Sequence, residues 1–175
     1  MTAPISKACF EDYEVSMALP TIGLEPMDRF DYIPIALILR DTNPLHLDRV
    51  YAQERGLSDV VQQGPLNQAY LYRYFTSLLH DPWDLLATKM RFAANVFPDD
   101  ILTCGGEVVA AAPLEAGGGI VTCAVWQRNQ KGETILKGEA KARIPSRRQQ
   151  GSYETCDSDL RREPSQRGCG RGART

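Results

Sequence analysis

Hydrophobic positions follow helical spacing through much of the first half of the chain. Residues 31–40 are almost entirely apolar, and Pro34 stands where proline suits the first turn of a helix. A second helix is predicted to begin at Asn43, a favoured N-cap residue, and to run to about Arg55. Gly56 would end that helix, since glycine readily adopts the left-handed conformation common after a helix.

The longest predicted helix covers residues 65–80, and its apolar residues occupy more than one face. A helix that is apolar nearly all round is expected to be buried on several sides. Ahead of all three helices, residues 13–19 form a short extended segment that ends at Pro20. The first half of the chain therefore predicts one short strand and three helices, the last of them inside the core.

Four strand-like stretches of about ten residues follow this helix, separated by short segments rich in Pro, Gly, Asn and Asp. Such regular spacing with breakers between stretches is typical of an antiparallel meander. A buried helix followed by long strands predicts an α+β fold in which an antiparallel sheet wraps around the helix. The predicted strands are residues 86–95, 101–111, 119–128 and 134–144.

The composition changes sharply after Pro145. Residues 146–175 contain seven Arg against four acidic residues, a net charge of +3, and only two large apolar side chains. Because the whole chain carries −2, residues 1–145 carry −5. A segment this poor in apolar groups cannot bury enough surface to offset the entropy lost on ordering. We therefore predict a folded domain at residues 1–145 and a disordered tail at 146–175.

The bulk composition narrows the possible classes of protein. A chain of 175 residues with 43% hydrophobic residues suits one soluble domain. A net charge of −2 gives no electrostatic reason to expect nucleic acid or an anionic membrane as a partner. The N-terminus shows no apolar secretory segment, so a cytoplasmic location is expected. Five scattered Cys and two His lack the clustered spacing of a metal site, and no metal is predicted.

The strongest chemical signal is the stretch Asp-Thr-Asn-Pro-Leu-His-Leu-Asp at residues 41–48. If Asn43 and Pro44 begin a helix, His46 falls in its first turn and Asp41 in the loop just before it. A carboxylate and an imidazole placed there can converge on one water molecule, and the free N–H groups at a helix start favour the ionised carboxylate. Asn43 is expected to act as the helix cap.

This stretch resembles the Asp-x-Asn-Pro-x-His-x-Asp signature of MaoC-like (R)-specific enoyl-CoA hydratases and dehydratases. Five defined positions in eight residues would match by chance in fewer than about one chain in ten thousand. The similarity extends over about residues 10–145. It includes the Gln-Gly step at Gln63 and Gly64, the stretches 90–102 and 126–133, and the closing segment 138–140.

The resemblance implies a hot-dog fold and a reaction on an acyl thioester carried by coenzyme A or a carrier protein. Asp41 and His46 would hold the water and handle both protons, while the backbone N–H of Gly64 would face the thioester oxygen. Asn43, Gln63 and Pro65 would lie on the substrate side. The resemblance implies no cofactor, and it implies a homodimer or a heterodimer with a related hot-dog subunit.

Two positions depart from the family pattern. The residue before Gly64 is Gln63 where histidine is common, and the turn at residues 98–100 reads Pro-Asp-Asp where Pro-Gly-Asp is common. Gln63 keeps open the alternative of a non-catalytic or partner-dependent subunit of a heteromeric hydratase. A hot-dog thioesterase, which would hydrolyse the thioester bond, is a further alternative, and the motif at residues 41–46 argues against it.

Overall fold

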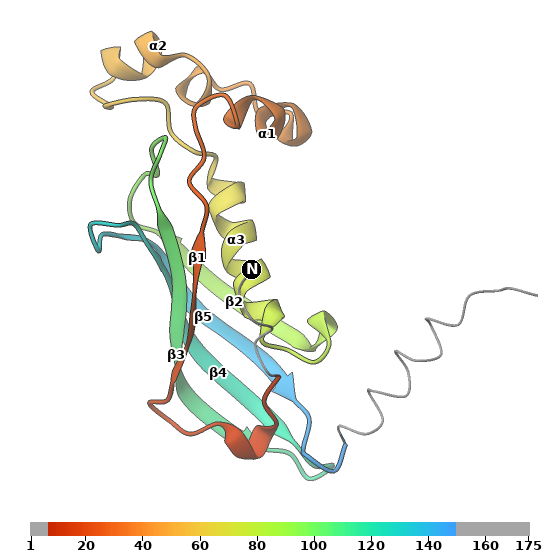
Figure 1. Ribbon diagram of the computed structural model, residues 1–175. Coiled ribbons are helices and arrows are strands. Elements are labelled where there is room, and N and C mark those ends of the chain that lie inside the picture. The colour runs from red at the N-terminus through yellow and green to blue at the C-terminus, as the bar shows by residue number, and fades with distance from the viewer. Residues whose placement is uncertain (1–6, 150–175) are drawn as a thin grey trace, which may run out of the picture.

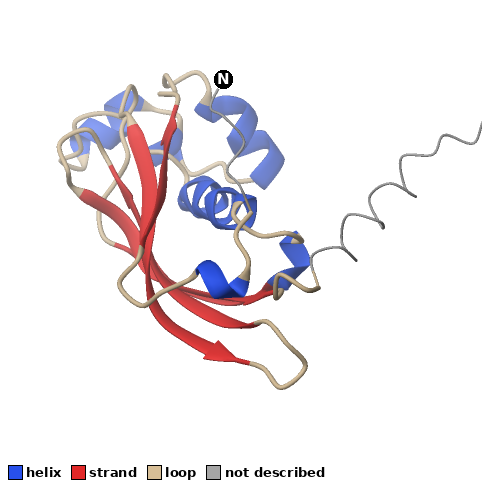
Figure 2. Ribbon diagram, turned by 60° about the horizontal axis from the view of Figure 1, so that its bottom comes forward, coloured by secondary structure: helices blue, strands red, loops and turns tan. Residues whose placement is uncertain are grey.

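Five antiparallel strands form one sheet in the order β1-β3-β4-β5-β2, and helix α3 lies against its concave face (Figures 1 and 2). The computed structural model describes residues 7–149. Its strands are β1 (Ala18–Leu24), β2 (Leu85–Phe92), β3 (Leu102–Pro113), β4 (Gly119–Arg128) and β5 (Thr134–Ile144). Its α-helices are α1 (Tyr32–Leu39), α2 (Arg49–Glu54) and α3 (Gly64–Ser77), and three short 3₁₀ turns cover Phe10–Asp12, Pro44–His46 and Pro82–Asp84.

Helix α3 buries one face against the sheet. Asn67, Leu71, Tyr74 and Phe75 are buried and recur every three or four residues, which places them on one side of the helix. The opposite side is exposed and includes Arg73, whose charge stays in water. The prediction of burial on several sides is therefore wrong, although α3 does supply the centre of the core.

The pairing of β2 differs from the predicted meander. Strands β3, β4 and β5 pair in sequence order, but β2 pairs with β5, for example Met90 with Gly138. The connections after β3 and β4 are five residues each, a length that suits hairpins, whereas nine residues separate β2 from β3. The longer connection carries the chain from one edge of the sheet to its interior.

The first strand was predicted at residues 13–19, and this placement is wrong. Strand β1 spans Ala18–Leu24 and continues through Pro20. Proline lacks the N–H that an inner strand would need, but β1 lies at an edge of the sheet, where one side of the ladder needs no partner. Its register also shifts between Leu19 and Ile22, so Pro20 falls in the irregular part of the pairing with β3.

The predicted helix from Asn43 to Arg55 is two separate pieces. A 3₁₀ turn covers Pro44–His46, and α2 begins after Asp48. The carboxylate of Asp48 accepts a hydrogen bond from the Tyr51 backbone N–H, so Asp48 is an N-cap. Aspartate favours such caps over helix interiors because its side chain competes for backbone donors, and the break leaves His46 at the end of a short turn.

The predicted disordered tail lies mostly outside the described residues. Within it, Ser146 is buried and the Gln149 side-chain amide donates to the backbone carbonyl of Ala116 at 2.9 Å. Residues 150–175 are not described, so the prediction of disorder there is untested. Among residues 7–149, no helix is long and apolar enough to cross a membrane.

Gly138 on β5 provides a test of the β2–β5 pairing. A Cβ at this position would overlap the backbone carbonyl oxygen of Lys89 on β2. We expect Gly138→Ala to lower the free energy of unfolding by roughly 1–3 kcal/mol, as overpacking does in other cores, measured by urea denaturation. Gly23→Ala on β1 is the control, because nothing lies within 4 Å of an added Cβ there. Equal stability of the two variants would contradict the pairing.

Candidate active site

Asp41 is positioned by the end of helix α1. Arg40 adopts the left-handed conformation, with φ 52° and ψ 33°, and turns the chain sharply out of the helix. The Asp41 backbone N–H donates to the carbonyl of Ala36 at 2.9 Å, which closes this turn. One carboxylate oxygen of Asp41 accepts a hydrogen bond from the backbone N–H of Asn43 at 3.2 Å. Both the backbone and the side chain of Asp41 are thus held locally.

His46 is held by the turn that follows. The Asn43 side chain accepts from the Leu45 backbone N–H at 3.1 Å, so it caps the turn as predicted. A second segment fixes the ring, because the Val61 carbonyl lies 2.7 Å from His46 Nδ1. The Val61 backbone N–H also donates to the Leu45 carbonyl at 3.0 Å. His46 therefore sits between its own turn and the segment that leads into α3.

The Val61 carbonyl also determines the histidine tautomer. A carbonyl oxygen only accepts, so Nδ1 must carry a proton, and a neutral His46 leaves Nε2 with a free lone pair. Nε2 lies 3.3 Å from Oδ2 of Asp41. The His46 side chain is 12% exposed and that of Asp41 is 36% exposed, so solvent and small molecules can reach the carboxylate. The pair can take a proton from a bound water and return one.

The start of helix α3 is connected to this pair through the segment at Val61. Val61, which binds His46, precedes Gly64 by three residues, and the Gln62 backbone N–H donates to the Val96 carbonyl at 2.9 Å. The first N–H groups of a helix have no partner within it, so Gly64 presents a free donor at a helix N-terminus. Within residues 7–149, no backbone carbonyl accepts from that N–H.

Gln63 is fully buried, at 0% exposure. Its side-chain amide donates to the Tyr32 backbone carbonyl at 3.1 Å, which ties the start of α1 to the start of α3. Its Oε1 is buried without a partner among the described residues, as is the Tyr32 hydroxyl. Burial raises the pKa of Tyr32 well above its usual value. The structure therefore gives Gln63 a bridging contact beneath the site.

The two other predicted residues lie at the surface of the protein. Asn43 and Pro65 are both exposed, Asn43 as the cap of the 3₁₀ turn and Pro65 as the second residue of α3. The Asp41 side chain contacts Asn43 and His46 directly. Gly64 and Pro65 are connected to these residues only through the segment that Val61 anchors to His46.

Sequence reasoning did not identify Phe92 as a neighbour of the site. Its ring carbons lie 3.5 and 3.6 Å from the position of a Cβ built on Gly64. Thr88, four residues earlier on β2, contacts the hydroxyl of Tyr72 on α3 at 2.9 Å, so this face of β2 points toward the helix. Phe92 is nevertheless 49% exposed. Because side chains alternate along a strand, Phe92 lies on the same face of β2 as Thr88, and this alternation was the sequence signal that could have identified it.

Among the described residues, no group of three or more His, Cys, Asp or Glu side chains is arranged to hold a metal ion. Two acceptor atoms at Asp41 and His46 and a free N–H at Gly64 instead suit proton transfer beside a developing negative charge.

Comparison with known proteins matches the MaoC like domain family model to residues 20–124. R-hydratase PhaJ1 from Pseudomonas aeruginosa is 25% identical, with a TM-score of 0.66, covering 79% of this chain and 86% of its own. The (R)-hydratase from A. caviae is 24% identical, with a TM-score of 0.65 and coverage of 77% and 99%. The ChsH1-ChsH2 complex from Mycobacterium tuberculosis is 24% identical, with a TM-score of 0.59 and coverage of 75% and 98%.

No curated protein sequence matches this chain. The predicted α+β hot-dog fold is confirmed.

Proposed function

This chain belongs to the MaoC-like domain family, and from that premise we propose that it adds water to, or removes water from, a 2-enoyl or 3-hydroxyacyl thioester. The observation that carries the proposal is the contact of His46 Nε2 with the Asp41 carboxylate at 3.3 Å, in a partly open site. Similarity to R-hydratase PhaJ1 supports the same class of reaction. Coenzyme A or a carrier protein would hold the acyl group.

In the hydration direction, the oxygen of a bound water attacks the β-carbon of the enoyl group. The Asp41–His46 pair takes one proton from that water and delivers one proton to the α-carbon, so the two steps together add one water across the double bond. The Val61 carbonyl keeps Nδ1 protonated and Nε2 directed at the reacting groups.

Negative charge develops on the thioester oxygen during this reaction, and the Gly64 N–H is the donor we propose for it. A helix N-terminus carries free N–H groups and a partial positive charge, both of which favour an anion. Asn43 and Pro65 are exposed and are proposed to border the bound acyl thioester. Gln63 would contribute indirectly, because the hydrogen bond from its side-chain amide to the Tyr32 carbonyl holds the start of α3 against the start of α1.

Phe92 is proposed to form an apolar wall beside Gly64, because its ring faces the start of α3 while half its surface remains open. We expect Phe92→Ala to lower kcat/KM for enoyl substrates by roughly 10-fold or more, the scale of a lost apolar pocket contact. Initial rates across an acyl-chain series would show it. Leu86→Ala is the control, since Leu86 lies on the same strand, is 46% exposed and lies away from Gly64. An equal loss of kcat/KM in the two variants would mean that Phe92 has only a structural role.

The proposed function is tested with purified chain and a series of trans-2-enoyl-CoA thioesters. Loss of the enoyl absorbance without release of free thiol is the expected result. Release of thiol would identify a thioesterase and overturn the hydratase assignment.

A second candidate is a subunit that needs a related partner for activity. It is favoured by the buried position of Gln63, which differs from the family's common histidine, and by the large apolar surface of α1. A silent assay for the chain alone, followed by activity on adding the partner, would establish it. The ChsH1-ChsH2 complex shares the fold, and a heteromer is therefore our second proposal.

A further inference from the structure

The short segment from Val61 to Gly64 carries two parts of the candidate site. At one end the Val61 carbonyl lies 2.7 Å from Nδ1 of His46, and at the other end the Gly64 N–H is the donor proposed for the thioester oxygen. Only Gln62 and Gln63 stand between them. The shape of this segment therefore sets how the acid–base pair and the donor face one another.

Both intervening glutamines are buried. Long polar side chains are seldom buried, because burial removes their hydration and their rotamer freedom. Each amide therefore needs a partner inside the protein. The Gln63 amide donates to the Tyr32 carbonyl, as described above. The Gln62 side-chain amide donates to Oδ1 of Asn67, which is also buried.

Asn67 contacts both residues that separate Val61 from Gly64. Its side chain accepts from Gln62, and its backbone N–H donates to the Gln63 carbonyl at 3.3 Å. The backbone N–H contact would form with any side chain at position 67. The contact with Gln62 requires a hydrogen-bonding side chain there, so it depends on the residue type.

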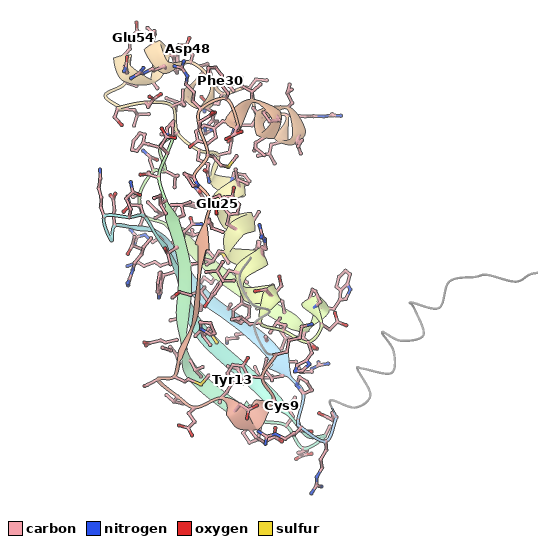
Figure 3. The ribbon with its side chains drawn as sticks, in the orientation of Figure 1. Cys9, Tyr13, Glu25, Phe30, Asp48 and Glu54 are labelled. Atoms are coloured by element: carbon pink, nitrogen blue, oxygen red, sulfur yellow. The ribbon has the colours of Figure 1, made fainter. Side chains whose placement is uncertain are left out.

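Asparagine is an unfavourable residue type at this position. Figure 3 shows that α3 begins at the end of the molecule that carries Phe30 and Asp48 and extends away from them beside the sheet. Asn67 is the fourth residue of α3 and lies on its buried face. Leucine would bury more apolar surface there and has a higher helix propensity. A residue that breaks such local preferences is expected where function requires it.

We propose that Asn67 is a positioning residue, whose bond to Gln62 fixes the direction of the Gly64 N–H relative to the Asp41–His46 pair. The inference rests on the proposed function. Asn67 is buried, so it acts on the reaction through the segment and not through contact with the substrate. A displacement of about 1 Å between reacting groups can lower a rate about 100-fold, which is enough for such a residue to control kcat.

The first test replaces Asn67 with Leu, which is similar in size but cannot accept a hydrogen bond. For trans-2-enoyl-CoA substrates, kcat is expected to fall roughly 10- to 100-fold, with KM close to wild type. Gln68→Leu is the matched control, because it removes the bond from the next side-chain amide to the Tyr72 hydroxyl at 2.9 Å and leaves the segment untouched. An equal loss of kcat in the two variants would overturn the proposal.

The second test separates positioning from stability. Asn67→Leu leaves the buried Gln62 amide unpaired, and this alone lowers stability. The double variant Gln62→Met/Asn67→Leu replaces the bonded pair with two apolar side chains of similar shape, a change that is often nearly neutral. We expect the midpoint of urea denaturation to return close to wild type while kcat stays low. Recovery of kcat together with stability would mean that Asn67 has only a structural role.

A third measurement is independent of activity. Residual dipolar couplings in NMR spectra report the directions of backbone N–H bonds. In the double variant the coupling of Gly64 is expected to change. Val61, whose N–H is bound to the Leu45 carbonyl, and Arg73, farther along α3, should keep theirs. An unchanged Gly64 coupling would overturn the proposal. A changed coupling in a chain that hydrates no enoyl thioester would count against the proposed function alone.

Discussion

Asp41→Asn and His46→Gln are each expected to lower kcat for enoyl-thioester hydration by roughly 10²–10⁴-fold, the usual contribution of a positioned acid or base. Asn at position 41 keeps an oxygen that can accept from the Asn43 N–H, so the loop should hold its shape. It cannot carry the negative charge that Asp41 places 3.3 Å from Nε2 of His46. Gln at position 46 cannot accept and release a proton near neutral pH.

The matched control for this experiment is Asp48→Asn. Asp48 belongs to the same eight-residue motif, but its carboxylate caps helix α2 through the Tyr51 N–H instead of pairing with His46. Asn and Asp cap helices about equally well, so kcat should stay close to wild type. A large loss with Asp48→Asn and none with Asp41→Asn would overturn the assignment of the acid–base pair.

Gly64→Pro is expected to lower kcat by roughly 10²–10³-fold relative to Gly64→Ala, the range seen when one donor to a developing oxyanion is removed. Proline removes the N–H, and it is well tolerated at the first position of a helix. Gln63 already has φ −62° and ψ 132°, an extended conformation that suits the residue before proline.

Gly64→Ala isolates the N–H in this comparison. Both substitutions introduce a Cβ ahead of Pro65, which disfavours the helical conformation at position 64 in the same way. The alanine Cβ would lie 3.5 Å from the Phe92 ring, an ordinary contact. Alanine keeps the N–H and proline does not, so the ratio of the two kcat values reports the donor. A ratio near one would remove Gly64 from the proposed chemistry.

Local features of the structure followed directly from local sequence. Asn43 caps its turn, Pro34 stands in the first turn of α1, and strands β4 and β5 have the predicted bounds. Each of these depends on hydrogen bonds or steric limits within a few residues, so the pattern of neighbours is enough to determine it. The motif at residues 41–48 likewise placed Asp41 and His46 together, because five residues of chain keep them close.

Errors arose where local signals competed. Asn43 and Asp48 are both good helix caps, and the second interrupted the helix that the first was predicted to begin. Pro20 was taken as the end of a strand, but an edge strand can include proline. In both cases the residue type was interpreted correctly, and the outcome depended on which neighbouring hydrogen bonds were available.

The sequence by itself determined the family motif, the acid–base candidates and most of the elements. Tertiary structure alone decided the tautomer of His46, the burial of Gln63 and the approach of Phe92 to Gly64, since each depends on partners 15 to 31 positions away in the chain. It also decided that β2 pairs with β5 and that Leu37 and Ile38 on α1 are exposed among the described residues. The physical reason is that hydrophobic spacing specifies which face of an element is apolar, whereas the packing of distant segments determines what covers that face.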